Sequence, residues 1–447
     1  MGLQIGFIST RFSGTDGVSL EAKKWADVLE AAGHDCYWFA GQTDGGSHRC
    51  MTVPQAHFNH FKNLEINSQA FGRNGRSPST TESIHQLRAL LKTRLHQFIK
   101  RYRLDLLVVQ NALSIPMNVP LGLAITETIA ETAIPTIAHH HDFAWERNRF
   151  ARNGVSDFLQ TAFPPKLPGI EHVVINSAAR EELAHRNGLS STLIPNVIDF
   201  THRPRISRTA RSFREAHGFS DSDIIILQPT RIIQRKGIEL AIDMLRQLKD
   251  DRYKLLVSHE AGDEGFHYAE WLGERARDQG VDLRFMTRPA RSPWEDAPGD
   301  ASDFSLWDMY AHSDFVTFPS LCEGFGNAFL EAVYFQKPIL VNRYATFLRD
   351  IEPLGFDLVM IDGYVDGKSV QDVRGILNSP DRRREIGLHN YRIASRHFSY
   401  EVLRSKLESI LNNLFGPSAR LQQEDKSTRN VFDLNGMAVY PQSAAAL

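Results

Sequence analysis

The chain has few cysteines, no long apolar run and almost no net charge. Only three of its 447 residues are cysteines, Cys36, Cys50 and Cys322, and none forms a CxxC pair. This scarcity argues against a disulfide framework and favours a reducing compartment. No apolar run approaches the roughly 20 residues that span a bilayer. The first residues also lack the basic segment and cleavage site of a signal peptide. We therefore expect a cytoplasmic protein.

The near neutrality of the chain bears on its partners. A net charge of -2 gives no electrostatic reason to expect nucleic acid. One basic amphipathic stretch, KTRLHQFIKRYR at residues 92–103, is of the kind that contacts anionic lipid, although a solvated helix face explains it more simply. We therefore expect at most peripheral membrane contact.

What the chain does have is a repeated α/β pattern. The run LQIGFIST is followed by a glycine-bearing turn, an amphipathic helix pattern and the apolar run DCYWFAG, which is how a doubly wound parallel sheet begins. Further strands are predicted at residues 104–111, 134–142, 171–177 and 191–199. After an arginine-rich connection at 201–219, the alternation restarts with DIIILQPTR. Two successive units of similar size predict two Rossmann-like domains.

Two cations stand where a parallel sheet binds ligands. In PTRIIQRKG, Arg231 ends a predicted strand and Lys236 precedes a predicted helix. Ligands of such sheets bind outside the carboxyl ends of the strands. Two fixed cations at that place could hold a diphosphate and stabilise its charge as it leaves. Two solvated surface cations would explain the same spacing.

A second motif, LCEGFGNAFLEAV, puts an acid, glycines and another acid around the start of a helix. Gly324 and Gly326 let the backbone approach a ligand closely. The helix predicted near Asn327 offers free N–H groups and a positive dipole end to an anion. Glu331 could accept two hydroxyls of a ribose, and Glu323 could contact a sugar. A capped helix with Glu331 in a solvated first turn is the alternative.

Together the two motifs resemble those of the retaining glycosyltransferases of family 4, the glycosyl transferases group 1, which have the GT-B fold. The segment LIPNVIDF also resembles the IPNGVD segment of that family, with Val197 in place of the glycine. The residues that match the two motifs are Arg231, Lys236, Gly237, Pro319, Ser320, Glu323, Gly324, Phe325, Gly326, Glu331 and Ala332.

The resemblance implies an α/β protein of GT-B fold, with two facing Rossmann-like domains and a cleft between them. On that basis we expect an N-terminal acceptor domain at residues 1–200, completed by a C-terminal helix at 396–415. A donor domain for the sugar nucleotide is expected at 201–395, and a polar tail at 416–447.

The resemblance also implies a hexosyltransferase, which moves a hexose from a nucleoside diphosphate sugar to a hydroxyl acceptor and retains the anomeric configuration. It assigns Arg231 and Lys236 to the leaving diphosphate, Glu323 to the donor sugar and Glu331 to the ribose. The N-terminal domain matches less closely. There, Gly17 resembles the glycine turn beside the diphosphate, and His141 resembles the strand-end histidine beside the donor sugar, with His140 as the alternative register. The implied catalytic set is His141, Arg231, Lys236 and Glu323, and the implied donor-binding set is Gly17, Gly324, Phe325, Gly326, Asn327 and Glu331.

The acceptor and the donor base are not fixed by these motifs. Arg147 and Arg149 lie just after the strand-end histidine and would suit a small acceptor that carries a carboxylate or phosphate. A salt bridge across the cleft wall explains them equally well. Base selection is expected near residues 284–289.

No metal site and no cofactor are expected. The Asp-Ser-Asp sequence at residues 221–223 mimics a metal motif of other glycosyltransferases, but it precedes a strand and favours a structural turn. Neighbouring side chains of the HHHD run would point to opposite faces of a strand and could not share one ion.

Other functions remain open at this point. A sugar-nucleotide 2-epimerase has the same fold, and a non-catalytic sugar-nucleotide-binding protein would keep the donor site alone. A Rossmann oxidoreductase is disfavoured, because the first strand is not followed by a GxGxxG with an acidic residue after the second strand.

Overall fold

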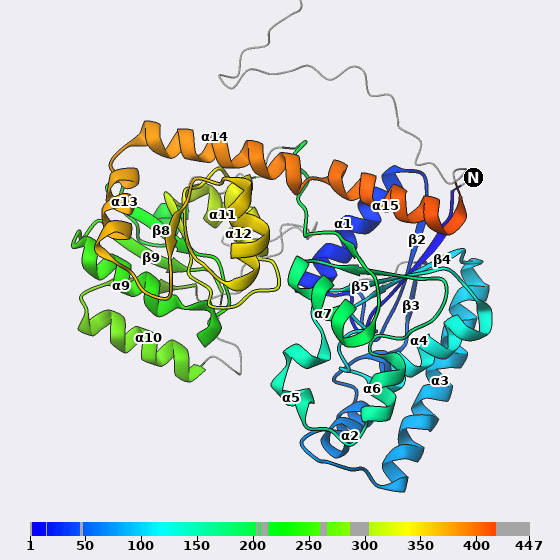
Figure 1. Ribbon diagram of the computed structural model, residues 1–447. Coiled ribbons are helices and arrows are strands. Elements are labelled where there is room, and N and C mark those ends of the chain that lie inside the picture. Colours follow the sequence, from blue (N-terminus) through cyan, green and yellow to red (C-terminus); the bar gives the residue numbers. More distant parts are fainter. Residues whose placement is uncertain are drawn as a thin grey trace, which may run out of the picture.

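The computed structural model describes residues 2–14, 16–44, 48–202, 204, 206, 213–259, 266–286 and 304–416. Within these residues the strands form two separate sheets, in which every strand pair is parallel. Figure 1 shows the sheets side by side in two halves of the molecule, each surrounded by helices. The expected α/β class, with two Rossmann-like units, is therefore confirmed.

The first sheet is built from the N-terminal half of the chain and has the strand order β3-β2-β1-β4-β5-β6-β7. Its strands are β1 (Gln4–Ile8), β2 (Asp35–Ala40), β3 (Cys50–Thr52), β4 (Leu106–Gln110), β5 (Thr136–His140), β6 (Ile170–Val174) and β7 (Thr192–Leu193). The helices of this half are α1 (Gly17–Ala31), α2 (Phe61–Ala70), α3 (Pro78–Tyr102), α4 (Val119–Thr132), α5 (Asn148–Ala151), α6 (Ser156–Ala162) and α7 (Ser177–Asn187), with short turns η1 (Pro54–Ala56) and η2 (Ala144–Glu146).

The second sheet has the order β10-β9-β8-β11-β12-β13. Its strands are β8 (Ile224–Gln228), β9 (Tyr253–Val257), β10 (Asp282–Phe285), β11 (Phe315–Phe318), β12 (Ile339–Asn342) and β13 (Val359–Ile361). Helices of the second half are α8 (Phe213–Ala216), α9 (Ile238–Leu248), α10 (Phe266–Asp278), α11 (Leu306–His312), α12 (Asn327–Tyr334), α13 (Gly367–Leu377), α14 (Pro380–His397) and α15 (Tyr400–Phe415), with short turns η4 (Gln234–Lys236), η5 (Phe347–Ile351) and η6 (Glu352–Leu354).

Both faces of each sheet are covered by helices, as parallel sheets require. In β4, Leu107 and Val109 pack with α3 and α4, whereas Leu106 and Val108 pack with α1 and α15. Successive residues of a strand point to opposite faces, so one short apolar run supplies two cores. The second sheet likewise lies between α9, α10 and α13 on one face and α11, α12 and α14 on the other.

The two halves are joined at their surface by the last helices. Figure 1 shows α14 over the second half and α15 beside α1 on the first. Leu403, Leu407 and Ile410 of α15 share a core with Trp25 and Val28 of α1. The end of the chain thus returns to the sheet with which the chain began.

The structure differs from the sequence predictions at some strands. The short strands β3 and β13 were not predicted. The strand expected at residues 191–199 is limited to β7, because the chain leaves the sheet at Pro195 and the Val197 carbonyl accepts a hydrogen bond from Lys24 Nζ at 2.6 Å. Most of the tail and part of the arginine-rich connection lie outside the described residues. No helix among the residues that the structure describes is both long and apolar enough to cross a membrane.

Candidate active site

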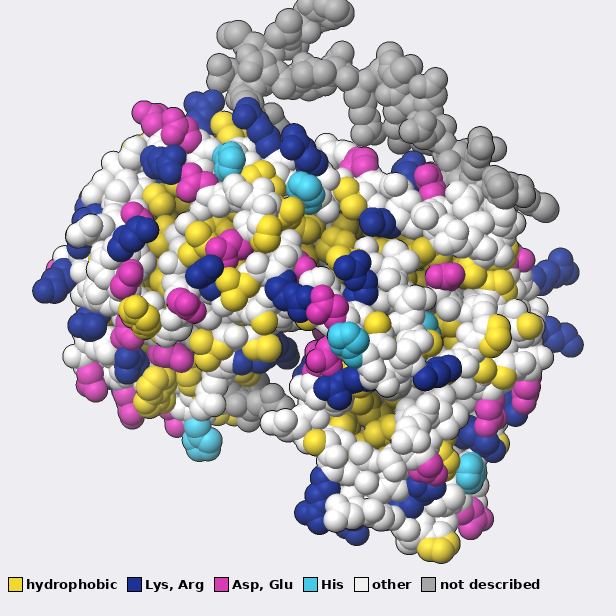
Figure 2. Space-filling model, in the orientation of Figure 1, with side chains coloured by type: hydrophobic (Ala, Val, Ile, Leu, Met, Phe, Trp, Pro, Cys, Tyr) yellow, Lys and Arg dark blue, Asp and Glu magenta, His cyan; other side chains and the backbone are white. Residues whose placement is uncertain are grey.

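The predicted site residues follow the carboxyl ends of strands in both sheets. In the second half, Arg231 follows β8, His259 follows β9 and Glu323 follows β11, and these three strands are neighbours. In the first half, Gln110 ends β4 and His141 follows β5. Figure 2 shows a hollow between the two halves, with basic, acidic and histidine side chains along its rim. Ligands bind at such strand ends in open parallel sheets.

Two helix N-termini from different halves meet at this place. Helix α1 begins at Gly17 and α12 begins at Asn327. A Cβ atom added to Gly17 would lie 3.4 Å from Asn327 Nδ2, so the two helix starts are in close contact. Asn196 Nδ2 donates a hydrogen bond of 2.6 Å to Asn327 Oδ1. The segment IPNVID and the second motif are thereby joined.

The glycines of the second motif fit tight places in the backbone. Gly326 has φ +124°, and a Cβ there would lie 2.8 Å from Tyr344 Oη. A Cβ on Gly324 would lie 3.3 Å from the carbonyl oxygen of His141. Helix α12 begins without a side-chain cap, so its first N–H groups are left for an anion.

The side chain of Phe325 points into the protein core, away from the predicted ligand site. Its ring is 3% exposed and packs in the core of the second half, with its centroid 5.3 Å from that of Phe398. The ring anchors the loop. Of this predicted donor-binding residue, only the backbone can face a ligand.

Glu323 is paired with two cations from the first motif. Lys236 Nζ donates to Glu323 Oε1, and Arg235 Nη1 lies 3.0 Å from Glu323 Oε2. Burial alone would raise the pKa of Glu323, but the charges of Lys236 and Arg235 bring that pKa below its usual range. Burial lowers the pKa of Lys236, against the opposing effect of Glu323. The sequence had not singled out Arg235.

Close packing holds the two motifs together. Gly237 has φ +61°, and a Cβ there would lie 2.4 Å from the carbonyl oxygen of Pro319. The Leu321 amide donates to the carbonyl of Arg235 at 2.8 Å. Glycine is therefore required directly after Lys236, which explains that part of the motif physically.

Arg231 and His259 complete the cationic side of the site. Arg231 is exposed, and its side chain makes no hydrogen bond or ion pair within the residues described. Burial, together with the charges of Arg231 and Lys236, lowers the pKa of His259 to about 4. Ser258 Oγ lies 2.7 Å from His259 Nδ1, and the other ring nitrogen has no hydrogen bond to the part of the chain that the structure describes. The sequence had given no signal for His259.

Glu331 lies one turn into α12, next to a buried tyrosine. Tyr310 Oη donates a hydrogen bond of 2.9 Å to Glu331 Oε2. Burial raises the pKa of Glu331 to about 7, although the hydrogen bond and the charge of Lys24 oppose the rise. This half-buried carboxylate is not the solvated first-turn residue that was the alternative.

The three consecutive histidines alternate between faces. His139 and His141 have ring centroids 4.3 Å apart, whereas His140 turns away and its Nε2 lies 2.9 Å from His172 Nδ1. His141 Nε2 lies 3.1 Å from Gln110 Oε1. Burial lowers the pKa of His141 to about 4, against the opposing charges of Asp142 and Asp16, so its ring is neutral at pH 7. Of the two registers, His141 is the one that lies at the site.

Helix α1 carries a buried ion pair that the sequence analysis did not predict. Glu21 and Lys24, 0% and 8% exposed, bond to each other, and Lys24 also bonds to the Val197 carbonyl. The charge of Lys24 acts on both His141 and Glu331. The i,i+3 spacing in an otherwise amphipathic helix could have indicated the pair, but its burial depends on distant residues.

The two arginines considered for an acceptor are already in contact with the protein. Arg147 Nε donates to Asp142 Oδ2 at 2.7 Å, in a salt bridge within the loop that follows β5. Arg149 contacts the Met117 sulfur and lies over the Phe150 ring at 4.5 Å. Both side chains are exposed.

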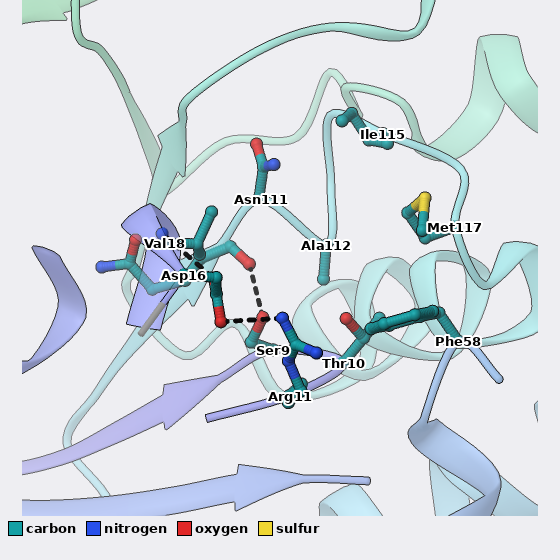
Figure 3. A pocket seen from close by; sticks show the side chains of 11 residues that line it. Ser9, Thr10, Arg11, Asp16, Val18, Phe58, Asn111, Ala112, Ile115 and Met117 are labelled. Carbon is teal, nitrogen blue, oxygen red and sulfur yellow. Dashed lines mark hydrogen bonds and ion pairs between the residues drawn. The ribbon is translucent and has the colours of Figure 1, made fainter. Parts of the chain in front are cut away.

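A pocket of about 100 Å³ lies beside His141 in the first half (Figure 3). It is lined by Ser9, Thr10, Arg11, Asp16, Val18, Phe58, Gln110, Asn111, Ala112, Ile115 and Met117. Gln110 belongs to this wall and also contacts His141, so the pocket adjoins the histidine.

The acidic sequence Asp-Ser-Asp forms a turn before β8, where Asp223 Oδ2 accepts from the Ser220 amide at 2.8 Å. No group of three or more His, Cys, Asp or Glu side chains in the described ranges is arranged to hold a metal ion. Residues 287–289 of the segment expected to select the base lie outside those ranges, and Arg284 pairs with Asp282 at 2.9 Å.

Comparison with known proteins agrees with this arrangement. Residues 297–392 match the family model described as glycosyl transferases group 1. The mannosylglucosylglycerate synthase of Petrotoga mobilis is 32% identical over 98% of both chains. That of Thermotoga maritima is 32% identical over 92% of this chain and 99% of its own.

A solved glycosyltransferase from Rickettsia africae has a similar fold, with a TM-score of 0.67 at 13% identity over 93% of this chain and 100% of its own. This likeness confirms the GT-B fold. The likeness to the two synthases extends along nearly the whole chain and includes both halves of the site. The chain therefore belongs to the group 1 glycosyltransferases and is an enzyme of that family.

Proposed function

We propose that the enzyme transfers a mannosyl group from a nucleoside diphosphate mannose to a hydroxyl of glucosylglycerate and retains the anomeric configuration. The observation that carries this proposal is the near full-length likeness to two mannosylglucosylglycerate synthases. Their product contains a mannosyl group, a glucosyl group and a glycerate, and transfer of the outermost sugar is a single glycosyl transfer.

The donor would lie on the second half of the molecule. Its diphosphate would meet Arg231, Lys236 and the uncapped N-terminus of α12, all at neighbouring strand ends. These groups are cationic or carry a positive dipole end, and they suit a leaving group that gains negative charge. Glu331, held by Tyr310, would accept the ribose hydroxyls.

Glu323 and His141 would meet the transferred sugar. The Glu323 carboxylate is kept ionised by Lys236 and Arg235, so it can accept hydrogen bonds from sugar hydroxyls. Neutral His141 is joined to Gln110 in the wall of the pocket of the first half, where the acceptor would bind (the acceptor pocket). An uncharged ring beside the anomeric carbon does not oppose the positive charge that develops there.

In the proposed reaction, the acceptor oxygen bonds to the anomeric carbon on the face from which the diphosphate departs. The bond between that carbon and the phosphate oxygen breaks, and the phosphate oxygen takes the proton of the acceptor hydroxyl. Arg231 and Lys236 stabilise the diphosphate as this happens. Because attack and departure use the same face, the configuration is retained.

The activity itself is the first prediction. Purified enzyme with guanosine or uridine diphosphate mannose and glucosylglycerate is expected to yield mannosylglucosylglycerate, measured by mass spectrometry. Nuclear magnetic resonance of the new glycosidic bond should show the anomeric configuration of the donor. An inverted product would contradict retention. An epimerised nucleotide sugar without transfer would contradict the proposed reaction.

Removal of either diphosphate cation should slow turnover much more than it destabilises the fold. For Arg231→Ala and Lys236→Ala we expect a loss of about 2–4 kcal/mol of transition-state stabilisation, or roughly a hundredfold in rate. Steady-state kinetics with thermal unfolding as the folding check measures this. Arg252→Ala, at an exposed ion pair with Asp250, is a matched control expected to behave like wild type. Wild-type turnover by a folded Arg231 or Lys236 variant would refute the diphosphate assignment.

Glu331→Ala should weaken the binding of the free nucleoside diphosphate by roughly tenfold or more, since a hydrogen bond to a charged group contributes about 1.5–3 kcal/mol. Glu331→Gln should be milder, because the amide oxygen still accepts one bond. The pKa of Glu331 is raised to about 7, so below that pH its side chain is protonated and accepts hydrogen bonds less well. The affinity of the wild-type enzyme should therefore fall below pH 7 more than that of Glu331→Gln. Calorimetry measures each affinity, and unchanged binding by Glu331→Ala would remove this residue from the site.

We also propose that the reaction needs no divalent metal. Two side-chain cations and a helix N-terminus converge where other glycosyltransferases place a cation on the diphosphate. Full activity should survive exhaustive EDTA treatment, apart from modest effects of ionic strength. Activity lost on chelation and restored by magnesium or manganese would overturn this expectation.

A further inference from the structure

The acceptor pocket contains one arginine, held in a fixed orientation. Arg11, in the loop after β1, donates from Nη2 to Asp16 Oδ2 at 2.9 Å and lies over the Phe58 ring at 5.3 Å. Figure 3 shows Arg11 with Asp16 on one side and Phe58 on the other. A guanidinium carries five N–H donors in a rigid fork. Among the described residues the Arg11 side chain makes one hydrogen bond, to Asp16, so its other donors remain for a ligand.

Both carboxylate oxygens of Asp16 accept hydrogen bonds within the protein. Asp16 Oδ1 accepts from the amides of Val18 and Ser19, both at 3.2 Å, and thereby caps α1. Asp16 Oδ2 accepts from Ser19 Oγ at 2.7 Å as well as from Arg11. Asp16 therefore fixes the direction of the Arg11 side chain, while the N-terminus of α1 stabilises the negative charge of Asp16.

A second polar group in the wall is buried and unsatisfied. Gln110 is 0% exposed, and its Nε2 has no hydrogen-bond partner among the described residues. Its Oε1 faces His141 Nε2 at 3.1 Å. An unpaired buried donor is costly, so this amide beside the pocket would gain from a ligand atom or an ordered water that accepts from it. The other walls, with Phe58, Ile115 and Met117, are apolar and suit the C–H face of a sugar.

We propose that Arg11 recognises the carboxylate of a glycosylated acid acceptor in this pocket, with the acceptor sugar toward Gln110 and His141. This inference rests on the proposed function and names the residue that selects its acidic acceptor. An arginine fork binds a carboxylate with two parallel hydrogen bonds, and a neutral acceptor cannot replace both. Arg147 is already paired with Asp142, and Arg149 lies at the rim on Met117.

The test compares two acceptors that differ only in charge. Glucosylglycerate carries a carboxylate where glucosylglycerol carries a hydroxymethyl group. At saturating donor, Arg11→Gln should lower kcat/KM for glucosylglycerate by roughly 10- to 100-fold, mainly through KM, because a charged hydrogen bond is lost in ground and transition states alike. It should leave kcat/KM for glucosylglycerol within about threefold. Arg11→Lys should recover part of the loss, and Arg252→Gln, at an exposed ion pair with Asp250 in the second half, is the matched control, expected to preserve the acid preference.

The possible failures are distinguishable. If wild-type enzyme uses glucosylglycerate and Arg11→Gln keeps the wild-type acid preference, the role of Arg11 is overturned and the proposed function stands. Equal wild-type use of both acceptors overturns the role of Arg11 as well. If wild-type enzyme transfers to no glycosylated acid, the proposed function fails, and the inference fails with it. Nucleoside diphosphate affinity and thermal unfolding of Arg11→Gln should match wild type. A fall in activity with both acceptors alike would overturn charge recognition.

Discussion

Glu323 is a nearly buried carboxylate that receives hydrogen bonds from two cations of another loop. Glu323 pairs with Arg235 as well as with Lys236, so the carboxylate keeps one partner when Lys236 is removed. Removing Glu323, in contrast, would leave the charge of Lys236 uncompensated in a poorly solvated place, which is strongly unfavourable. The pair therefore ties the loop after β8 to the loop after β11. Gly237 permits the close approach to Pro319 that brings the loops together. Because Glu323 directly precedes Gly324, the same bond sets the path of the chain into α12.

The loop between Glu323 and α12 also makes hydrogen bonds with the first half of the molecule. Asn176 Nδ2 donates to the Gly324 carbonyl at 2.8 Å, and Asn196 bonds to Asn327. The Ser177 amide donates to Asp350 Oδ2 at 2.8 Å, and Arg349 pairs with Glu181. These four contacts between the halves are polar, and Ile175, just after β6, adds an apolar one because it packs in the core of the second half. The last helices, α14 and α15, also connect the two halves.

How far the sequence predicts this protein depends on the range of the interactions involved. Apolar runs and glycine turns depend on neighbouring residues, so the two parallel sheets and the position of α12 were predicted from pattern. The short strands β3 and β13 were missed because three-residue strands leave almost no periodic signal. Arg235 and Asp16 were missed because their partners are recognisable only after folding or after the helix start is known. The Glu21–Lys24 pair was not predicted because Lys24 also bonds to the Val197 carbonyl, which is distant in the sequence.

The histidines show the same limit at the site itself. Two registers were predicted for the strand-end histidine, and only the packing of β5 between β4 and β6 decides between them: His140 faces His172 of β6, and His141 faces Gln110 of β4. Asn111 then fixes the turn, since its Oδ1 accepts from the His141 amide at 3.0 Å while its backbone takes φ +60°. A left-handed conformation is tolerated by asparagine better than by most residues. His141 is thus held on one side by a side chain that also lines the pocket of the first half, and its carbonyl lies against Gly324 of the second half. A single strand end therefore connects the pocket to the loop that leads into α12.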